Sequence, residues 1–343
     1  PLDKERDTAR LIVHTDGGSR LVLDFAALRD ENLEQDLAAR DFTMNAIAID
    51  LSDRGRIIDP LHGAKEIYQK VLRACSAESF VDDPLRILRA VRLAIQFDFK
   101  IEANTIKLIK QTTPDLANVS PERLRDETFR LLNNKHVDTS LRIMQTLGIL
   151  PHIFPETSPL IGLRQTSPHT QDAWNHTLSV VQKLEQILFV LGLDSDLEEA
   201  GNIISSWISL RLGRYRQQFA EHFSEKLNPE RTPQSLLFLA AIYHDVGKAE
   251  TQSVDAQQRI HFYRHEQISQ ERVVKRARFL RLSGPEIDRL AAITGGHLRP
   301  LLLNQSTEIP TRRAIYKFWR DLDEAGVDVC LLSIADLMGT YGA

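Results

Sequence analysis

The spacing of apolar residues changes near Pro84, and this change constrains what the chain can fold into. Before Pro84, short apolar runs at 11–13 and 21–25 flank a turn at 15–19 that contains two glycines, a pattern that predicts a β-hairpin. After Pro84, apolar residues recur three and four positions apart, which predicts amphipathic helices. We therefore expect a mixed α and β region first and an all-helical region after it.

Prolines at 151, 155 and 159 indicate a linker or a domain boundary. Because a chain of 343 residues is long for one domain, we expect three segments, at residues 1–75, 76–150 and 160–343. Helices are expected in the last of these at residues 174–191, 200–212, 233–243, 265–282, 285–293, 312–321 and 327–338.

Composition excludes several classes of protein. No apolar run is long enough to span a membrane, and no signal-peptide pattern opens the chain. The two cysteines, Cys75 and Cys330, do not suggest a disulfide framework, so we expect a cytoplasmic protein. The net charge of −4 argues against binding of polyanions by the whole surface, but basic residues gather between Arg86 and Arg130 and predict a local groove for nucleic acid.

Two blocks carry the strongest functional signal: residues 40–46 read RDFTMNA, and residues 82–89 read DDPLRILR. Together they resemble two signature blocks of the class II tRNA nucleotidyltransferase and poly(A) polymerase family, although Ala39 and Asp82 stand where that family usually has Arg and Glu. The resemblance implies a polymerase-β-like head of α+β type followed by an all-α neck. It also implies that the nucleotide is bound by Arg40, Asp41, Asn45, Asp83, Arg86 and Arg89.

The same resemblance implies Mg²⁺ held by an Asp-x-Asp pair and a third acid. Asp24 resembles the third acid and is the expected catalytic residue, although it could instead be a polar residue on the exposed face of a strand. No Asp-x-Asp pair in a strand context precedes it. We expect that the sequence begins after the family's first catalytic strand, the alternative being that nucleotidyl transfer has been lost.

Asp83 and Arg86 allow an argument from chemistry about the base that is chosen. If they lie three positions apart on one helix, they share a face. A carboxylate accepts hydrogen bonds and a guanidinium donates them, which suits the amino group and unprotonated ring nitrogen of cytosine and adenine. Uracil and guanine would leave buried groups unpaired, at a cost of roughly 1–3 kcal/mol each. We therefore expect CTP and ATP as substrates.

His244 and Asp245 end an apolar stretch that should be a buried helix. A buried His is more often an ordinary core residue, but burying an Asp beside it is costly unless a cation pairs them. The pair resembles the HD phosphohydrolase superfamily, which implies a C-terminal all-α HD domain with His176 and Asp336 as further ligands and with His265 and His297 able to hold a second metal. The metal would be Mn, Ni, Co, Fe or Mg, and Lys248 would contact phosphate. His169, His222 and His261 are expected at the surface.

Three functional readings follow. The first is a tRNA nucleotidyltransferase that adds C, A or both to the tRNA 3′ end and carries an HD phosphohydrolase domain. The second is an HD enzyme, of the kind that hydrolyses 2′,3′-cyclic phosphates, with a non-catalytic nucleotide- or RNA-binding front half. The third is an RNA-binding protein without turnover. The sequence leaves the product (CCA, CC, A or a tail) and the oligomeric state open.

Overall fold

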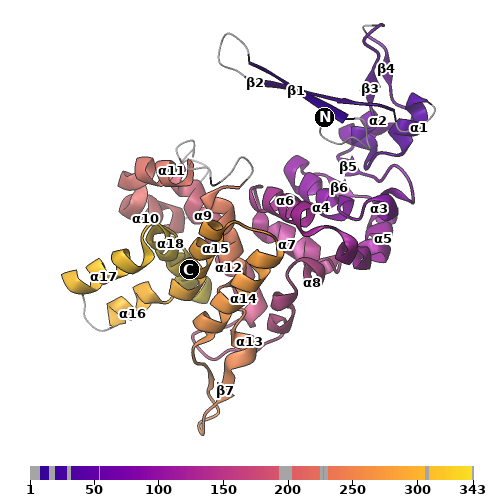
Figure 1. Cartoon of the computed structure of the whole chain (residues 1–343). Helices are drawn as coiled ribbons and strands as arrows, with labels where there is room; N and C mark the ends of the chain where they lie inside the picture. The colour runs from indigo at the N-terminus through magenta and orange to yellow at the C-terminus, as the bar shows by residue number, and fades with distance from the viewer. Residues whose placement is uncertain are drawn as a thin grey trace.

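The computed structural model describes residues 8–14, 20–28, 32–53, 55–192, 203–224, 227, 231–305 and 309–341. The turn expected at 15–19 lies outside these residues. An N-terminal region of ribbons and short helices is followed by a helical middle and then by a larger helical bundle, so the predicted change from mixed to helical structure is confirmed (Figure 1).

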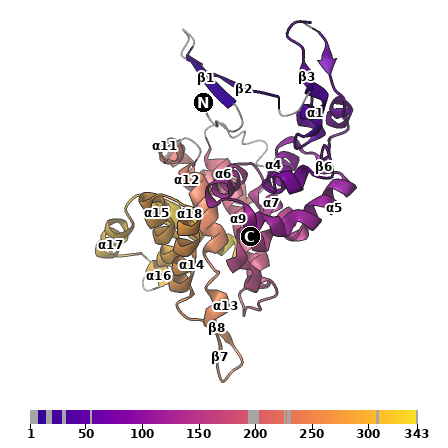
Figure 2. The same ribbon diagram turned by 45° about the vertical axis from the view of Figure 1, so that its right-hand side comes forward.

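Two antiparallel ribbons belong to the N-terminal region. Strands β1 (Thr8–His14) and β2 (Arg20–Ala26) pair with Arg10 opposite Asp24, and the ribbon projects from the rest of the molecule with its described side chains exposed (Figures 1 and 2). The second ribbon pairs β3 (Ala48–Ile49) with β4 (Ile57–Ile58). The accompanying helices are α1 (Leu33–Ala38), η1 (Thr43–Asn45) and α2 (Gly63–Tyr68).

The helical middle contains one parallel strand pair, β5 (Val71–Leu72) with β6 (Lys100–Ile101). Its helices are α3 (Ser79–Asp82), α4 (Arg86–Phe97), α5 (Ala103–Thr112), η2 (Thr113–Asn118), α6 (Pro121–Leu132), α7 (Val137–Thr146), α8 (Leu150–Ile153) and η3 (Pro155–Leu160). The segment with the three prolines is not an extended linker, and the alternative, a domain boundary there, stays a prediction. Pro151 and Pro155 stand in the first turns of short helices, where a missing N–H costs little, and Phe154 and Leu160 are fully buried.

The bundle is built around α12 (Pro233–Tyr243), every residue of which except Gln234 is buried. Thr232 and Ser235 form a capping box at its start, and Pro233 occupies its first turn, so the local sequence fixes where the helix begins. Helix α9 packs along α18, and α14 packs along α15. The other elements are α9 (Ala173–Leu191), α10 (Ile203–Leu212), η4 (Gly213–Tyr215), α11 (Arg216–Ser224), α13 (Lys248–Thr251), α14 (His265–Phe279), α15 (Gly284–Gly296), α16 (Arg299–Gln305), α17 (Arg312–Leu322) and α18 (Ala325–Tyr341).

One departure from the all-helical expectation is a β-hairpin, β7 (Gln252–Val254) with β8 (Ile260–Phe262), which extends from the bundle (Figure 1). Across the described ranges, we find no helix that combines the length and the apolar character needed to cross a bilayer.

Candidate functional sites

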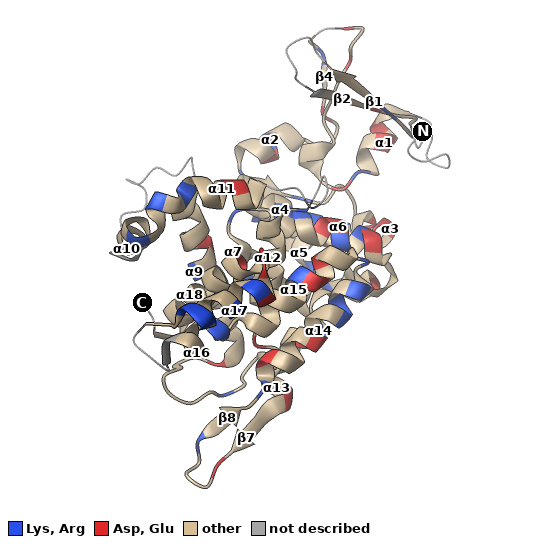
Figure 3. Ribbon diagram, turned by 60° about the vertical axis from the view of Figure 1, so that its left-hand side comes forward, with Lys and Arg blue, Asp and Glu red and all other residues tan. Residues whose placement is uncertain are grey.

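A cavity of about 510 Å³ lies between the N-terminal region and the helical middle. Five arginines and five carboxylates line it, together with Asn45 and four apolar residues. Helix α6 contributes alternating basic and acidic residues to it (Figure 3). The charged lining residues are Asp36, Arg40, Asp41, Asp83, Arg86, Arg89, Arg123, Asp126, Glu127 and Arg130. The sequence-predicted residues from Arg40 to Arg89 all contribute to this cavity.

Asp41 is the most buried of the predicted nucleotide-binding acids, with 7% of its surface exposed. Its Oδ1 accepts hydrogen bonds from the backbone N–H of Phe42 at 2.8 Å and from Asn45 Nδ2 at 3.1 Å. Its Oδ2 lies 2.8 Å from Arg89 Nε on α4. Phe42 anchors this segment, because its side chain is fully buried and it bridges Ala74. The RDFTMNA block therefore holds one carboxylate in a fixed position at the cavity wall.

Asp83 and Arg86 do not lie on one helix face, contrary to the sequence-based expectation. Asp83 follows α3 with an extended backbone (φ −150°, ψ 95°), and α4 begins only at Arg86. The reason is Pro84, whose ring disfavours helical geometry in the residue before it. Both side chains nevertheless line the cavity.

Arg86 braces the site. Its guanidinium donates to the carbonyl oxygens of Ala39 at 3.1 Å, Ser79 at 3.1 Å and Arg40 at 3.3 Å. The group that holds Asp83 is Arg123 of α6, whose Nη2 lies 2.7 Å from Asp83 Oδ2. The place of Arg123 in the cavity was not predicted from the sequence. The signal that could have found it is its motif, SPERLRDE, which places it one turn into the helix that packs against α4.

Asp24 is not among the residues that line the cavity. It lies on the exposed ribbon, where its two carboxylate oxygens accept from Arg10 Nε at 2.6 Å and Nη2 at 2.9 Å. That double hydrogen bond lowers the pKa of Asp24. Its neighbours Ala26, Ala27 and Leu28 do line the cavity, so β2 leads into the site although Asp24 itself stands apart.

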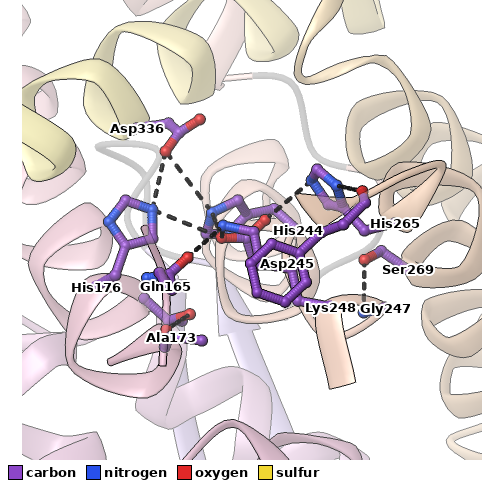
Figure 4. A network of polar contacts seen from close by, with 12 residues as sticks. Gln165, Ala173, His176, His244, Asp245, Gly247, Lys248, His265, Ser269 and Asp336 are labelled. Atoms are coloured by element: carbon purple, nitrogen blue, oxygen red, sulfur yellow. Dashed lines mark hydrogen bonds and ion pairs between the residues drawn. The ribbon is translucent and has the colours of Figure 1, made fainter. Parts of the chain in front are cut away.

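A second site lies inside the bundle, where the six residues predicted as metal ligands come together from five helices and their ends (Figure 4). His176 Nε2 lies 2.9 Å from Asp336 Oδ1 and 3.6 Å from Asp245 Oδ2. His244 Nε2 lies 3.2 Å from Asp245 Oδ2, and His265 Nε2 lies 3.2 Å from Asp245 Oδ1. Ligand atoms of His176, His244 and Asp245 form one compact group, and those of Asp245, His265 and His297 form another.

The protonation of three of these histidines follows from their hydrogen bonds. Nδ1 of His244, His265 and His297 lies 2.7–2.8 Å from a backbone carbonyl oxygen, that of Ala241, Phe262 and Thr294 respectively. A carbonyl can only accept, so Nδ1 carries the proton and Nε2 presents a lone pair. All three Nε2 atoms are buried and have no hydrogen-bond partner among the described residues. The three Nε2 atoms thus converge on the carboxylates of the cluster without a hydrogen-bond partner of their own among the described residues.

The charges in this cluster call for a cation. Burial alone would raise the pKa of Asp245, but His244 and Lys248 hold it well below its usual range. Burial also opposes ionisation of Asp336, yet the hydrogen bond with His176 brings the pKa of Asp336 to about 2. Burial lowers the pKa of His297 to about 4, so His297 is neutral. Burial disfavours the charged form of His244, but Asp245 and Asp336 raise its pKa, so its imidazole competes for a proton that a bound cation would replace. Two carboxylates and four imidazoles are the donor set that divalent metals bind, and the residues present fit such a metal.

The mouth of this cluster opens into a cavity of about 340 Å³. Its walls come from the segment before α9, from β8, and from the end of α18. Lys248 Nζ lies there, 2.6 Å from Asp245 Oδ2 and 2.7 Å from Gln165 Oε1. His169 was expected at the surface but lines this cavity. Its ring packs edge-on to His176 with the centroids 4.7 Å apart, and burial lowers its pKa to about 4.

His222 was also expected at the surface but belongs to a buried polar group. Its Nε2 lies 2.9 Å from Asp328 Oδ1 and 2.9 Å from Arg289 Nη2, and Asp328 is fully buried. This group joins α11, α15 and α18 away from the metal cluster and serves their packing.

Three models of known families match successive segments of the chain. The family model described as "Poly A polymerase head domain" matches residues 5–73, and "Probable RNA and SrmB- binding site of polymerase A" matches residues 98–161. The model described as "HD domain" matches residues 209–337. The family predicted from the two motifs and from the His-Asp pair is confirmed.

Two relatives show how far the similarity extends. The "CC-adding tRNA nucleotidyltransferase" of Geobacter sulfurreducens is 45% identical over 154 residues, which cover 45% of this chain and 35% of that protein. The "A-adding tRNA nucleotidyltransferase" of Deinococcus radiodurans is 31% identical over 304 residues, covering 87% of this chain and 58% of that protein. The chain therefore matches between about a third and three fifths of the length of these relatives.

Solved structures share the fold. A Thermotoga maritima CCA-adding enzyme complexed with tRNA has a TM-score of 0.55 and 23% identity, and the match covers 97% of this chain and 63% of that one. A structure described as a tRNA-processing enzyme with CTP has a TM-score of 0.61 and 22% identity, covering 96% and 71%. The predicted fold class, a partial α+β head followed by helical neck and HD regions, is confirmed.

Proposed function

Because this chain belongs to the tRNA nucleotidyltransferase and poly(A) polymerase family and carries an HD domain, we propose that it adds C, A or both to the 3′ end of tRNA, with CTP and ATP as substrates and Mg²⁺ as cofactor. We place this nucleotidyl transfer in the cytoplasm. The names of the relatives, one CC-adding and one A-adding, support this class of substrate. They do not separate the two products for this chain.

The observation that carries the proposal is the 510 Å³ cavity and its charges. Its volume falls in the range of small-molecule sites, roughly 300–1,000 Å³. The five arginines offer donors to the phosphates and sugar of a nucleotide, and Arg is the side chain best suited to that task. Asp41, held by Phe42, Asn45 and Arg89, is placed to accept from a sugar hydroxyl or to meet a bound cation.

Base choice would rest on Asp83 with a guanidinium beside it. The carboxylate accepts from the amino group of cytosine or adenine, and an arginine donates to the adjacent ring nitrogen. Arg86 and Arg123 both line this cavity. Arg86 is held there by hydrogen bonds to backbone carbonyls, and Arg123 is held by its ion pair with Asp83. Uracil and guanine present a carbonyl to the carboxylate and would be rejected.

Equilibrium binding of the four nucleoside triphosphates in Mg²⁺ tests this proposal. CTP and ATP should bind more tightly than UTP and GTP, and Asp83→Asn should narrow the difference because an amide can both donate and accept. Equal binding of all four by the unaltered protein would contradict the base-reading argument. Salt-dependent tRNA binding without any nucleotide preference would favour the third reading, an RNA-binding protein without turnover.

A second function is favoured by the metal cluster of the bundle. We propose that it hydrolyses phosphoesters such as 2′,3′-cyclic phosphates, with His176, His244, Asp245 and Asp336 as ligands of one divalent metal and His265 and His297 completing a second site. The metal, which would be Mn, Ni, Co, Fe or Mg, would supply an activated water. Lys248 would bind a phosphate oxygen at the mouth, and the three backbone carbonyls would hold the histidine rings in the ligating orientation.

Hydrolysis of a 2′,3′-cyclic nucleotide with added divalent metal tests the second function. It should survive Asp83→Ala and be lost in Asp245→Ala. Activity that persists in Asp245→Ala would show that the cluster is not the hydrolytic site.

A further inference from the structure

A third cavity, of about 670 Å³, lies where the helical middle meets the bundle. It is bounded by residues after the end of α6, by the first turn of α7, and by one side of α9 and the start of α12. None of the residues that line the nucleotide cavity or form the metal cluster lines this third cavity. Its lining comprises Asn133, Asn134, Lys135, His136, Asp138, Thr139, Gln182, Glu185, Gln186, Leu188, Phe189, Gln234 and Phe238.

One part of the wall is flat and apolar. Phe189 is 47% exposed although it is a large aromatic residue on a helix whose opposite face is buried, and Leu188 and Phe238 lie beside it. A partly exposed aromatic ring at a cavity wall is a surface on which a planar ring can stack, and alanine substitution at such positions costs roughly 1–3 kcal/mol per base in single-stranded nucleic acid complexes.

Another part of the wall is rich in amides. Gln182, Gln186 and Gln234 each carry both a donor and an acceptor, the combination that reads the edge of a nucleobase. The Oε1 atom of Gln186 is buried and has no hydrogen-bond partner among the described residues. An orphan amide oxygen beside a cavity is a group that a ligand donor, reaching it after a small side-chain movement, would satisfy.

Glu185 and Asp138 close the cavity on the side of α7. Glu185 accepts a hydrogen bond from the backbone N–H of Val137, and burial together with Asp138 raises the pKa of Glu185 to about 8. Glu185 and Asp138 thus hold each other and the start of α7 in place, so this side of the cavity is fixed by the fold.

Lys135 lies at the rim of this cavity, and helix α6 leads from the first cavity to it. Lys135 and His136 are exposed at the rim, where a phosphate could be contacted. Arg130, near the end of α6, lines the first cavity, and Asn133, directly after α6, lines this one. Residues 133–139 also fall within the stretch that matches the RNA-binding family model.

We propose that this cavity binds one unstacked nucleotide, with its base against Phe189 and the glutamine side chains and its phosphate at Lys135. The occupant is either a nucleotide of the RNA whose 3′ end lies in the first cavity or a free mononucleotide. The continuity along α6 favours the RNA nucleotide. This inference rests on the proposed function insofar as it needs RNA to bind.

The test compares Phe189→Ala with Phe279→Ala. The two rings are 47% and 48% exposed, and Phe279 does not line any of the three cavities, so it is a matched control. Binding of a fluorescein-labelled acceptor-stem minihelix is measured by anisotropy at one fixed salt concentration. Equilibrium dialysis with AMP, CMP, GMP and UMP is run in an Arg89→Ala background, so that binding in the first cavity is weakened. Circular dichroism checks that each variant is folded.

We expect Phe189→Ala to weaken minihelix binding by ~10-fold or more, as loss of one base stack would, and Phe279→Ala to leave it unchanged. Loss of mononucleotide binding in Phe189→Ala, with RNA binding unaltered, would support the cavity and identify a free nucleotide as its occupant. Unchanged binding of both probes by Phe189→Ala overturns the inference while the proposed function stands. Failure of the unaltered protein to bind either probe would contradict both this inference and the proposed function.

Discussion

The nucleotide cavity and the metal cluster are both crowded with charge, but they balance it in opposite ways. In the nucleotide cavity, carboxylates such as Asp41, Asp83 and Glu127 have arginine partners inside the protein, and those arginines are about half exposed or less. In the metal cluster, His244 Nε2, His265 Nε2 and His297 Nε2 are buried and have no hydrogen-bond partner among the described residues.

The difference indicates what each site is built to receive. Arg89 and Arg123 are partly exposed while they hold their carboxylates, so their remaining N–H groups can donate to phosphates as a nucleotide enters. A buried set of lone pairs cannot satisfy itself by rearrangement. The first site is suited to a charged substrate that comes and goes, and the second to a cation that stays.

The largest effect should follow removal of a metal ligand. In Asp245→Asn we expect the affinity for divalent metal to fall by more than ~100-fold, because the carboxylate is the residue common to both ligand groups. Metal content after dialysis, measured by mass spectrometry, checks this. Arg89→Ala, in the other site, should keep its metal. Equal metal content in the two variants would show that Asp245 is not a metal ligand.

Metal removal should change stability next most. A metal bound at 100 times its Kd stabilises the folded state by about 2.7 kcal/mol, so chelation should lower the Tm of the unaltered protein by several degrees. His244→Ala should show no response to chelator, since its cluster has lost a ligand. If chelator left the Tm of the unaltered protein unchanged, a bound metal would not be what stabilises the cluster.

In the nucleotide cavity, a change of one atom should alter selectivity more than stability. Asp83→Asn is expected to reduce the preference for CTP over UTP by ~10-fold, because one buried hydrogen bond of the wrong polarity is worth about 1–3 kcal/mol. Competition binding measures it. Tm should hardly move, since Asp83 is partly exposed and its partner Arg123 is 46% exposed. A large loss of Tm would show that the pair is structural.

Glu185 lies outside both sites and beside another acid, Asp138, so among the described residues it has neither the arginine partner of the first site nor the histidines of the second. Glu185 has a pKa raised from 4.5 to about 8 by burial and by Asp138. Between these two pKa values the folded state keeps a proton that the unfolded chain releases. The contribution of Glu185 to the free energy of unfolding should therefore be fully present below pH ~4.5 and should be lost as pH rises toward 8. Glu185→Gln should flatten the dependence of Tm on pH across this interval. A profile identical to that of the unaltered protein would place Glu185 in a more polar setting.

The smallest effect is expected at the ribbon. Asp24 and Arg10 form a close ion pair, but their side chains are 57% and 45% exposed. Asp24→Asn should leave Tm unchanged within error, because solvent screens exposed pairs. Any effect of this substitution should instead appear in nucleotidyl transfer, if Asp24 acts there. A marked fall in Tm would show that the ribbon is held by this pair.

Much of the bundle could be predicted from the sequence because its helices are marked at both ends. The expected helices at 233–243 and 312–321 agree with α12 and α17 to within a residue, since Thr232 and Thr311 cap them and apolar spacing runs through them. The His244-Asp245 pair was singled out from residue type and position, and the other four residues of the cluster were expected from the resemblance to the HD superfamily; the structure brings all six together. The hairpin at 252–262 was missed because its strands have three residues each, too short for a period to show.

The nucleotide cavity was less predictable, for a physical reason. Its residues come from loops, from helices α1, η1, α4 and α6 and from the end of strand β2, and local sequence does not say which guanidinium meets which carboxylate. Pro84 did carry the information that Asp83 is not helical, but spacing alone suggested a shared face. His169 and Arg123 were missed because their importance depends on neighbours distant in the chain.

The arrangement of the metal ligands has a further consequence for how the bundle would respond to cutting. His176 and Asp336 are 160 residues apart in sequence yet touch, and the ligands between them sit at the ends of different helices. An ion bound to all of them would act as a cross-link that closes a very long loop, where restricting the unfolded chain has its greatest entropic effect. A protease that nicked the exposed hairpin β7–β8 would then leave two fragments held together by helix packing and by the ion, and a chelator should lower the denaturant concentration at which they separate.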